Sequence, residues 1–276
     1  MRNKEPNFTV LMSVYKNDDP IYFEKALSSV FSNTLQPTTF LLVVDGNIPI
    51  SLHNTIDRYK HYSYFKVIYL TSNLGLAEAL NAGIKKITTD WIIRADADDI
   101  NHKNRFEVLF REMHGPFDLI GSSIREINKQ GQVLGERSTP LTATDILTFM
   151  SRRNPFNHMS VAYRTNIINK CDGYPSIYLR EDYALWIKMT IIGARMKNIP
   201  DILVDATTGN EMYARRGGIK YSIGEYRLQK LLVSSGIKPP FRGVIDGALR
   251  AIVFIGPQIL RKFIYERFLR KKLFTK

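Results

Sequence analysis

Three carboxylates lie within a stretch of four residues, shortly after a short apolar run. Trp91 to Ile93 is predicted to form a buried strand, and Asp96, Asp98 and Asp99 come soon after it. Carboxylates this close repel unless a cation neutralises them, and α/β proteins bind ligands just beyond the C-terminal ends of strands. We therefore expect Asp96 and Asp98 to hold a hard divalent cation that in turn holds a diphosphate. The alternative is a solvated acidic turn in which Asp99 or Asn101 caps the next helix.

A second acidic pair, Glu181-Asp182, stands at the start of a predicted helix that runs from Tyr183 to Met189. The helix dipole favours the charged form of a carboxylate in this position, while a like-charged neighbour opposes it. Taken without the other motifs, this pair is most simply interpreted as helix capping.

The elements that must position these groups are apolar runs alternating with helical patterns. Runs at 8–14, 40–44, 65–70 and 91–93 read as strands, and Asp19-Pro20 is a typical helix start. The alternation predicts a parallel, wound α/β sheet. Tyr15, Asp45 and Asn73 follow the first three strands, so they should meet the acidic loop at one edge of the sheet. An aromatic platform and a carboxylate there suit a nucleotide base.

The familiar phosphate-binding motifs are missing from the sequence. No Gly-x-Gly-x-x-Gly follows the first strand, and no Gly-x-x-x-x-Gly-Lys-Ser/Thr occurs. A dinucleotide-binding fold and a P-loop are therefore disfavoured.

Composition limits the class of protein. The 276 residues are 44% hydrophobic and 24% charged, as in ordinary globular proteins. The single cysteine, Cys171, rules out an internal disulfide and a Cys-rich zinc site, and it fits a reducing cytoplasm. No secretory h-region and no apolar run of about 18 residues is visible, so we expect a soluble or peripheral protein.

The net charge of +13 indicates a polyanionic partner. Residues 241–276 hold nine Lys/Arg against two Asp/Glu, so over half of the excess lies in the tail. Because no zinc finger, RNP aromatic signature or basic-leucine pattern is present, we expect no nucleic-acid partner. The tail resembles a basic amphipathic helix at a membrane surface; the alternative is a tail packed on the catalytic domain.

As a set, the motifs resemble those of family 2 glycosyltransferases, which have the GT-A fold and invert the anomeric centre. The match covers about residues 8–215, and it most resembles bacterial O-antigen and exopolysaccharide transferases of the amylovoran type. The motifs that carry it are Ser13-Val14-Tyr15, Asp45-Gly46, Asn73-Leu74-Gly75, Asn81-Ala82-Gly83, Arg94 to Asp99, Glu181-Asp182 and Met212 to Gly218.

The resemblance implies roles for the residues that would bind the donor. Tyr15 would lie near the uracil and Asp45 would bind its edge. Asn73 and Gly75 would shape the nucleotide pocket. Arg94 would support the diphosphate or the acidic loop.

It also implies the metal ligands and the base. Asp96 would contact the ribose or the metal, and Asp98 would coordinate Mn²⁺ or Mg²⁺. Asp99 is a weaker ligand candidate that would instead orient the loop. Asp182 would be the catalytic base, with Glu181 beside it.

Four further residues are candidates for the acceptor side or a mobile loop. His158 is an acceptor-side candidate, although a lone histidine is more often structural. Trp186 is most simply a core residue, with acceptor stacking as the alternative. Arg215 and Arg216, next to two glycines, suit a loop that closes over diphosphate, or else a solvated basic loop.

The expected architecture is an α/β GT-A domain, with a mostly parallel wound sheet, helices on both faces and a helical basic C-terminal tail. Residues 1–218 form the catalytic domain, with a nucleotide-binding half at about 8–100 and an acceptor-binding half at about 101–218. Residues 118–133 are expected to add a mixed portion to the sheet, and 159–163 a further strand. Residues 219–276 form the extension, with a helix over 219–235 and a break at Pro239-Pro240.

The resemblance predicts transfer of a hexose, glucose or galactose, from a UDP-sugar to a lipid-linked acceptor. The expected acceptor is GlcNAc-diphospho-undecaprenol, with a β1,3 linkage, in O-antigen, capsule or exopolysaccharide repeat-unit synthesis. The enzyme would work in the cytoplasm on the inner face of the cell membrane. The alternatives are a nucleotidyl or phosphoryl transferase using the same acidic loop, and a non-catalytic membrane or nucleic-acid binding module.

Overall fold

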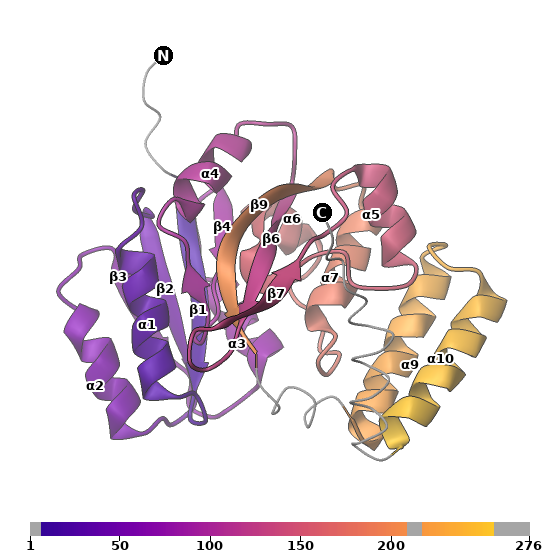
Figure 1. Cartoon of the computed structure of the whole chain (residues 1–276), viewed down its shortest axis with the longest axis horizontal. Helices are drawn as coiled ribbons and strands as arrows, with labels where there is room; N and C mark the ends of the chain where they lie inside the picture. Colours follow the sequence, from indigo (N-terminus) through magenta and orange to yellow (C-terminus); the bar gives the residue numbers. More distant parts are fainter. Residues whose placement is uncertain (1–6, 209–216, 257–276) are drawn as a thin grey trace.

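The computed structural model describes residues 7–208 and 217–256, and its centre is one β-sheet with helices on both faces (Figure 1). The strands are β1 (Phe8–Tyr15), β2 (Thr39–Asp45), β3 (Phe65–Tyr69), β4 (Trp91–Arg94), β5 (Ile100–Asn101), β6 (Leu119–Ile127), β7 (Val133–Arg137), β8 (Ala162–Arg164) and β9 (Met196–Thr207). The helices are α1 (Pro20–Phe31), α2 (Ile50–Tyr59), α3 (Leu76–Ile84), α4 (Arg105–Glu112), α5 (Ala143–Met150), α6 (Thr165–Lys170), α7 (Glu181–Ile191), α9 (Ile219–Ser234), α10 (Pro240–Ile255) and the 3₁₀ turn η1 (His158–Ser160).

The first half of the chain forms the predicted parallel sheet. β1 pairs in parallel with both β2 and β4, and β2 pairs in parallel with β3. The register sets Tyr15 opposite Asp45 at the ends of β1 and β2. The polar residues that follow these strands are therefore gathered along one edge of the sheet.

The second half is mixed and departs from the prediction in detail. β8 runs antiparallel to β4 and β6, while β6 pairs in parallel with β9. The strand expected over 159–163 is instead the turn η1 followed by the short β8. β9, which was not predicted, contains Pro200 and Asp201, two residues that are rare within strands. The register with β6 jumps from Ile199 to Ile202, so an irregularity takes up both residues.

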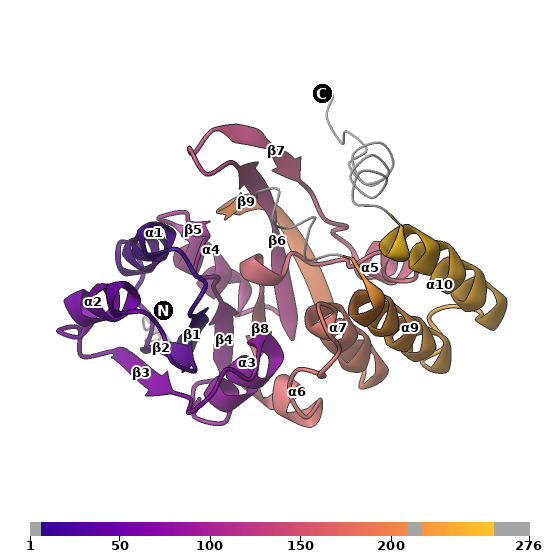
Figure 2. The same ribbon diagram turned by 90° about the horizontal axis from the view of Figure 1, so that it is seen from below.

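Two apolar clusters lie on opposite faces of the sheet. Successive strand side chains alternate between faces, so Val10 and Met12 pack toward α1, α2 and α4 while Leu11 packs toward α3 and α7. Figure 2 shows α1 and α2 on one side of the parallel strands and α3 on the other. Burial on both faces explains why β1 and β2 are nearly continuous apolar runs.

Several predicted helix boundaries are confirmed. Asp19 caps α1 by accepting a 2.8 Å hydrogen bond from the Ile21 amide, with Pro20 in the first turn. α9 covers the helix expected over 219–235. Pro239 and Pro240 separate α9 from α10, because proline fits the first turn of a helix and cannot continue one.

α9 and α10 form a hairpin that lies beside α7 (Figures 1 and 2). A Cβ atom on Gly243 would stand 2.5 Å from Val233 Cγ2, so this glycine lets the two helices come together closely. Leu228 and Leu232 of α9 join the apolar cluster that contains α7. Residues 241–255 belong to α10, which packs on α9 and touches the catalytic domain where Arg250 donates to the Arg152 carbonyl. The described residues include no helix with the length and apolar character needed to cross a membrane.

Candidate active site

The acidic loop after β4 is built on a buried arginine. Arg94 is fully buried, and it donates hydrogen bonds to Asp96 and to the Ala95 carbonyl. Burial alone would lower the pKa of Arg94, but the neighbouring Asp96 carboxylate helps to raise it above its usual value. Arg94 therefore stays charged and fixes Asp96, which is half-buried, while Asp98 is exposed. The loop presents one fixed and one exposed carboxylate.

Asp99 anchors the acidic loop to β9. Its side chain is buried, and Oδ1 accepts a 2.8 Å hydrogen bond from the Thr207 amide. Burial, with Asp98 and Asp96 nearby, raises the pKa of Asp99 well above its usual value. This geometry fits the loop-orienting role expected for Asp99.

The alternative reading of the loop as a helix cap is wrong. The next helix, α4, begins at Arg105 with Asn104 at the cap position. Asn101 lies in β5 instead, where its backbone and side-chain nitrogens donate to Ser29 Oγ at 3.0 and 2.9 Å. Neither Asp99 nor Asn101 is therefore placed to cap α4.

On the nucleotide side, Asp45 organises the loop after β3. Its Oδ1 accepts from the Leu74 amide at 2.7 Å, and its Oδ2 accepts from Asn73 Nδ2 at 3.0 Å and from the Gly75 amide at 2.9 Å. Gly46 makes the approach possible, because a Cβ there would stand 2.5 Å from the Asn73 nitrogen. The structure thus joins the two motifs that the sequence placed at neighbouring strand ends.

Asp182 lies in the first turn of α7 and is half-buried. Its Oδ2 accepts a 2.6 Å hydrogen bond from Asn154 Nδ2, and its Oδ1 accepts from the Tyr183 amide at 2.7 Å. The adjacent Glu181 is buried, and burial together with Asp182 raises its pKa to about 7. Glu181 therefore carries a proton for part of the time near neutral pH, which weakens its repulsion of Asp182.

His158 connects the acidic loop with the start of α7. Burial and the Arg94 charge lower the pKa of His158 to about 4, while Asp182 and Asp96 oppose that shift. The imidazole is neutral at physiological pH, and its Nε2 lies 2.9 Å from the Tyr174 hydroxyl. The Arg94 amide donates a 3.0 Å hydrogen bond to the Val161 carbonyl, and Asn154, four residues before His158, donates to Asp182. The segment that carries His158 therefore contacts both the strand end before the acidic loop and the start of α7.

Asn154 and Tyr174 are candidate site residues that the sequence analysis missed. The Tyr174 hydroxyl is shared with His158 and with the Tyr163 hydroxyl at 3.1 Å. Asn81 of α3 holds the Tyr174 backbone on both sides, by accepting from its amide at 2.7 Å and donating to its carbonyl at 3.0 Å. Asn81 stood in one of the quoted motifs, but nothing local in the sequence indicated that its partner would be Tyr174, 93 residues away.

Burial determines how Trp186 and Cys171 are interpreted, and the two remaining arginine candidates are not among the described residues. Trp186 is completely buried, so it is a core residue and stacking on an acceptor is excluded. Cys171 is buried as well, and burial raises the pKa of its thiol, which does not favour a nucleophile. Arg215 and Arg216 lie outside the described residues.

The residues of the acidic loop suit a metal that a substrate helps to hold. Within 7–208 and 217–256 no three His, Cys, Asp or Glu side chains are grouped as a complete ligand set. Mg²⁺ and similar ions commonly use one or two carboxylates and take further oxygens from substrate phosphates. Asp96 and Asp98 supply that number and type of ligand.

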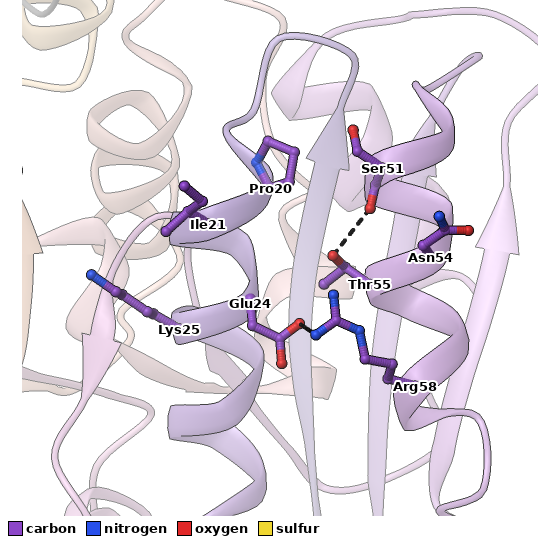
Figure 3. A pocket seen from close by; sticks show the side chains of 8 residues that line it. All are labelled: Pro20, Ile21, Glu24, Lys25, Ser51, Asn54, Thr55 and Arg58. Carbon is purple, nitrogen blue, oxygen red and sulfur yellow. Dashed lines mark hydrogen bonds and ion pairs between the residues drawn. The ribbon is translucent and has the colours of Figure 1, made fainter.

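A separate pocket of about 500 Å³ lies between α1 and α2 (Figure 3). Glu24 and Arg58 form a 3.0 Å ion pair within it, and Thr55 donates to the Ser51 carbonyl at 3.1 Å. No residue of the acidic loop or of α7 lines this pocket. The candidate active site is therefore defined by the converging side chains and not by this pocket.

Comparison with solved structures supports the fold. The chain matches Staphylococcus aureus TarS 1-349 in complex with UDP-GlcNAc with a TM-score of 0.67, at 17% identity, over 97% of this chain and 76% of that chain. It matches the mannosyltransferase PcManGT from Pyrobaculum calidifontis, in complex with GDP-Man and Mn²⁺, with a TM-score of 0.63, at 13% identity, over 96% of this chain and 80% of that chain. These likenesses confirm the expected GT-A fold.

Sequence relatives and a family model identify the class of protein. The chain is 34% identical, over 99% of its length and 100% of the relative's, to an Escherichia coli UDP-Gal:alpha-D-GlcNAc-diphosphoundecaprenol beta-1,3-galactosyltransferase. It is 32% identical, over 94% of its length and 98% of the relative's, to the amylovoran biosynthesis glycosyltransferase AmsE of Erwinia amylovora. The family model described as glycosyl transferase family 2 matches residues 9–181. The chain therefore belongs to glycosyl transferase family 2, and it is a glycosyltransferase.

Proposed function

We propose that this enzyme moves a hexose, galactose or glucose, from a UDP-sugar to a sugar carried on a lipid diphosphate, with inversion at the anomeric carbon. GlcNAc-diphospho-undecaprenol is the proposed acceptor and β1,3 the proposed linkage, by analogy with the Escherichia coli relative. The pathway would be O-antigen, capsule or exopolysaccharide repeat-unit synthesis. The observation that carries the proposal is that the segment 154–161 contacts both acidic motifs, through the hydrogen bond from Asn154 to Asp182 and the one from the Arg94 amide to the Val161 carbonyl. Inverting transfer needs a diphosphate site and a base on either side of one sugar.

The nucleotide would bind over the ends of β1 and β2. Tyr15 is half-buried there and offers a ring to the base. The Asp45 carboxylate accepts three hydrogen bonds from 73–75. A carboxylate has about four acceptor positions, so one is left for a base N–H. Asn73 and Gly75 would line the pocket because Asp45 holds their loop in place.

Asp96 and Asp98 would hold Mn²⁺ or Mg²⁺ together with the diphosphate oxygens. When bound, such an ion supplies a Lewis acid that stabilises the charge developing on departing UDP. Arg94 fixes Asp96 and adds a positive charge to a site that must accept phosphates. Asp99 would maintain the shape of the loop through its hydrogen bond to Thr207.

Asp182 would take the proton from the acceptor hydroxyl. As that oxygen forms its bond to the anomeric carbon, the bond from this carbon to the β-phosphate oxygen breaks and the electron pair leaves with UDP. Asn154 orients the Asp182 carboxylate. A neutral His158 beside them suits contact with an uncharged sugar hydroxyl.

The enzyme would act in the cytoplasm, seated on the inner face of the cell membrane. Six apolar side chains on one face of α10, each more than half exposed, support this seat: Phe241, Val244, Ile245, Leu249, Ile252 and Ile255. The basic tail, of which 257–276 lie outside the described residues, would add attraction of on the order of 1 kcal/mol per Lys or Arg near an anionic leaflet. A lipid-linked acceptor requires such a location because its lipid stays in the bilayer.

A panel of UDP-sugars tested on a synthetic GlcNAc-diphosphate-lipid, with and without chelator, examines the proposal directly. We expect UDP release that depends on a divalent ion, and a β1,3 linkage in the product by NMR. Release of pyrophosphate would instead point to nucleotidyl transfer, which family membership already disfavours. Failure of every UDP-sugar on this acceptor would contradict the proposed substrates.

A further inference from the structure

The backbone just before Asp182 adopts an unfavourable conformation. Leu179 has φ 52°, in the left-handed region where a residue other than glycine costs about 1 kcal/mol or more. Arg180 follows at the cap position of α7, and its carbonyl accepts a 2.9 Å hydrogen bond from the Ala184 amide. Such a conformation persists only when surrounding contacts enforce it.

The enforcing contacts come from α9. Arg180 Nη2 and Nε donate to Glu225 Oε2 at 2.7 and 3.0 Å, and the guanidinium lies over the Tyr221 ring, 4.5 Å from its centroid. A Cβ on Gly224 would stand 2.8 Å from the Tyr178 carbonyl oxygen. α9 is therefore pressed against the segment that leads into Asp182.

Glu225 has a second ion pair on its other oxygen. Its Oε1 accepts from Arg250 Nη1 at 2.9 Å and from Gln229 Nε2 at 2.7 Å. The side chain is completely buried. Burial by itself would raise the pKa of Glu225, but Arg180 and Arg250 lower it below its usual value. One buried, charged carboxylate thus joins two arginines.

Arg250 extends this connection to the other side of Asp182. Its Nη2 donates to the Arg152 carbonyl at 2.5 Å. Arg152 lies two residues before Asn154, whose side chain donates to Asp182. Glu225 is therefore connected to Asp182 twice, through the backbone at Arg180 and through the loop that carries Asn154.

We propose that Glu225 is a positioning residue for catalysis, which sets the Asp182 carboxylate through Arg180 and Arg250. This inference rests on the proposed role of Asp182 as the base. Because Glu225 is fully buried, it cannot touch a substrate. The α9–α10 hairpin would then help to position the catalytic base. This hairpin lies beyond residues 9–181, which the family model matches.

The test substitution is Glu225→Gln in the full-length protein. A glutamine oxygen can accept from one arginine, but its amide group opposes the other. We expect kcat to fall about tenfold or more, because even a small displacement of a catalytic group lowers the rate strongly. The KM for the UDP-sugar should stay the same. Glu112→Gln is the matched control, because it makes the same substitution in α4, where it breaks the ion pair with Lys197 and leaves every hydrogen bond of Glu225 in place. An unchanged kcat in Glu225→Gln would overturn the proposal.

Combination with Asp182→Asn separates positioning from a general loss of structure. If Glu225 acts through Asp182, adding Glu225→Gln to Asp182→Asn should leave the residual rate almost unchanged. An equal fractional loss in both backgrounds would contradict the proposal. If circular dichroism shows Glu225→Gln unfolded, Glu225→Asp replaces it in both backgrounds, with a smaller loss of kcat expected and the same contradicting outcome.

The two proposals fail in different ways. If Asp182→Asn turns over at the wild-type rate, Asp182 is not the base and the proposed mechanism is refuted. If Asp182→Asn loses turnover while a folded Glu225→Gln protein keeps it, only the positioning role of Glu225 is refuted.

Discussion

Asn154 Nδ2 donates a 2.6 Å hydrogen bond to Asp182 Oδ2, which joins the loop before η1 to the first turn of α7. A hydrogen bond to a charged group contributes about 1.5–3 kcal/mol. We therefore expect Asn154→Ala to lower kcat by about one to two orders of magnitude while the KM for donor is kept. Steady-state kinetics at saturating acceptor measures both. A rise in donor KM at unchanged kcat would show that Asn154 serves donor binding instead.

Asp98 is the exposed carboxylate of the acidic loop, and Asp98→Asn should raise the concentration of Mn²⁺ or Mg²⁺ needed for half-maximal turnover. An amide is a weaker ligand than a carboxylate for these hard cations. Asp57→Asn is a matched control, because Asp57 forms its 2.7 Å pair with Lys60 on α2. Activity is titrated with each metal after treatment with chelator. Identical titration curves for Asp98→Asn and wild type would argue against Asp98 as a ligand.

Gly46 and Gly131 both have φ +81°, but only Gly46 is crowded. Gly46→Ala adds a methyl group about 2.5 Å from the Asn73 nitrogen, so it should disturb the nucleotide loop as well as strain the backbone. Gly131→Ala, with no atom within 4 Å of the added carbon, should carry the strain alone. We expect weaker UDP binding by calorimetry for Gly46→Ala only. Equal UDP affinity in both variants would contradict the role given to this contact.

The raised pKa of Glu181 predicts how stability depends on pH. Its pKa is about 7 in the folded protein against 4.5 for the ordinary group, because of burial and then the neighbouring Asp182. An acid whose pKa is higher in the folded than in the unfolded protein adds to the free energy of unfolding below pH 4.5. This contribution is lost as the pH rises through 7. Glu181→Gln should remove this loss, which amounts to on the order of 3 kcal/mol above pH 7. Urea unfolding at pH 5 and pH 8 tests this. A wild-type-to-variant difference that is the same at both pH values would refute it.

Much of the nucleotide-binding half could be predicted because its signals are local. β1, β2 and β4 are apolar runs buried on both faces, and each is followed by the polar residue that defines the site. Tyr15 and Asp45 could be placed together because parallel strands end at the same edge of the sheet. Gly46 was part of a motif in the sequence, but only the structure shows its close approach to the Asn73 nitrogen.

The second half was harder to predict because long-range packing decides it. β9 was missed since Pro200 and Asp201 interrupt its pattern, and only its pairing with β6 shows how the sheet accommodates them. Neither Asn154 nor Glu225 has a local sequence signature. Asn154 contacts Asp182, which is 28 residues away in the chain, and Glu225 contacts Arg180, which is 45 residues away. Trp186, by contrast, was expected to be a core residue, and its complete burial confirms this.

The central claim is that Asp182 is the base of a site whose other side binds UDP. It is tested most directly by comparing Asp182→Asn with wild type for UDP binding and for hexose transfer in the same preparation. We predict wild-type affinity for UDP in the presence of Mn²⁺, and a loss of transfer of at least about 100-fold, the usual contribution of a general base. Transfer at the wild-type rate by a folded Asp182→Asn protein would contradict the account.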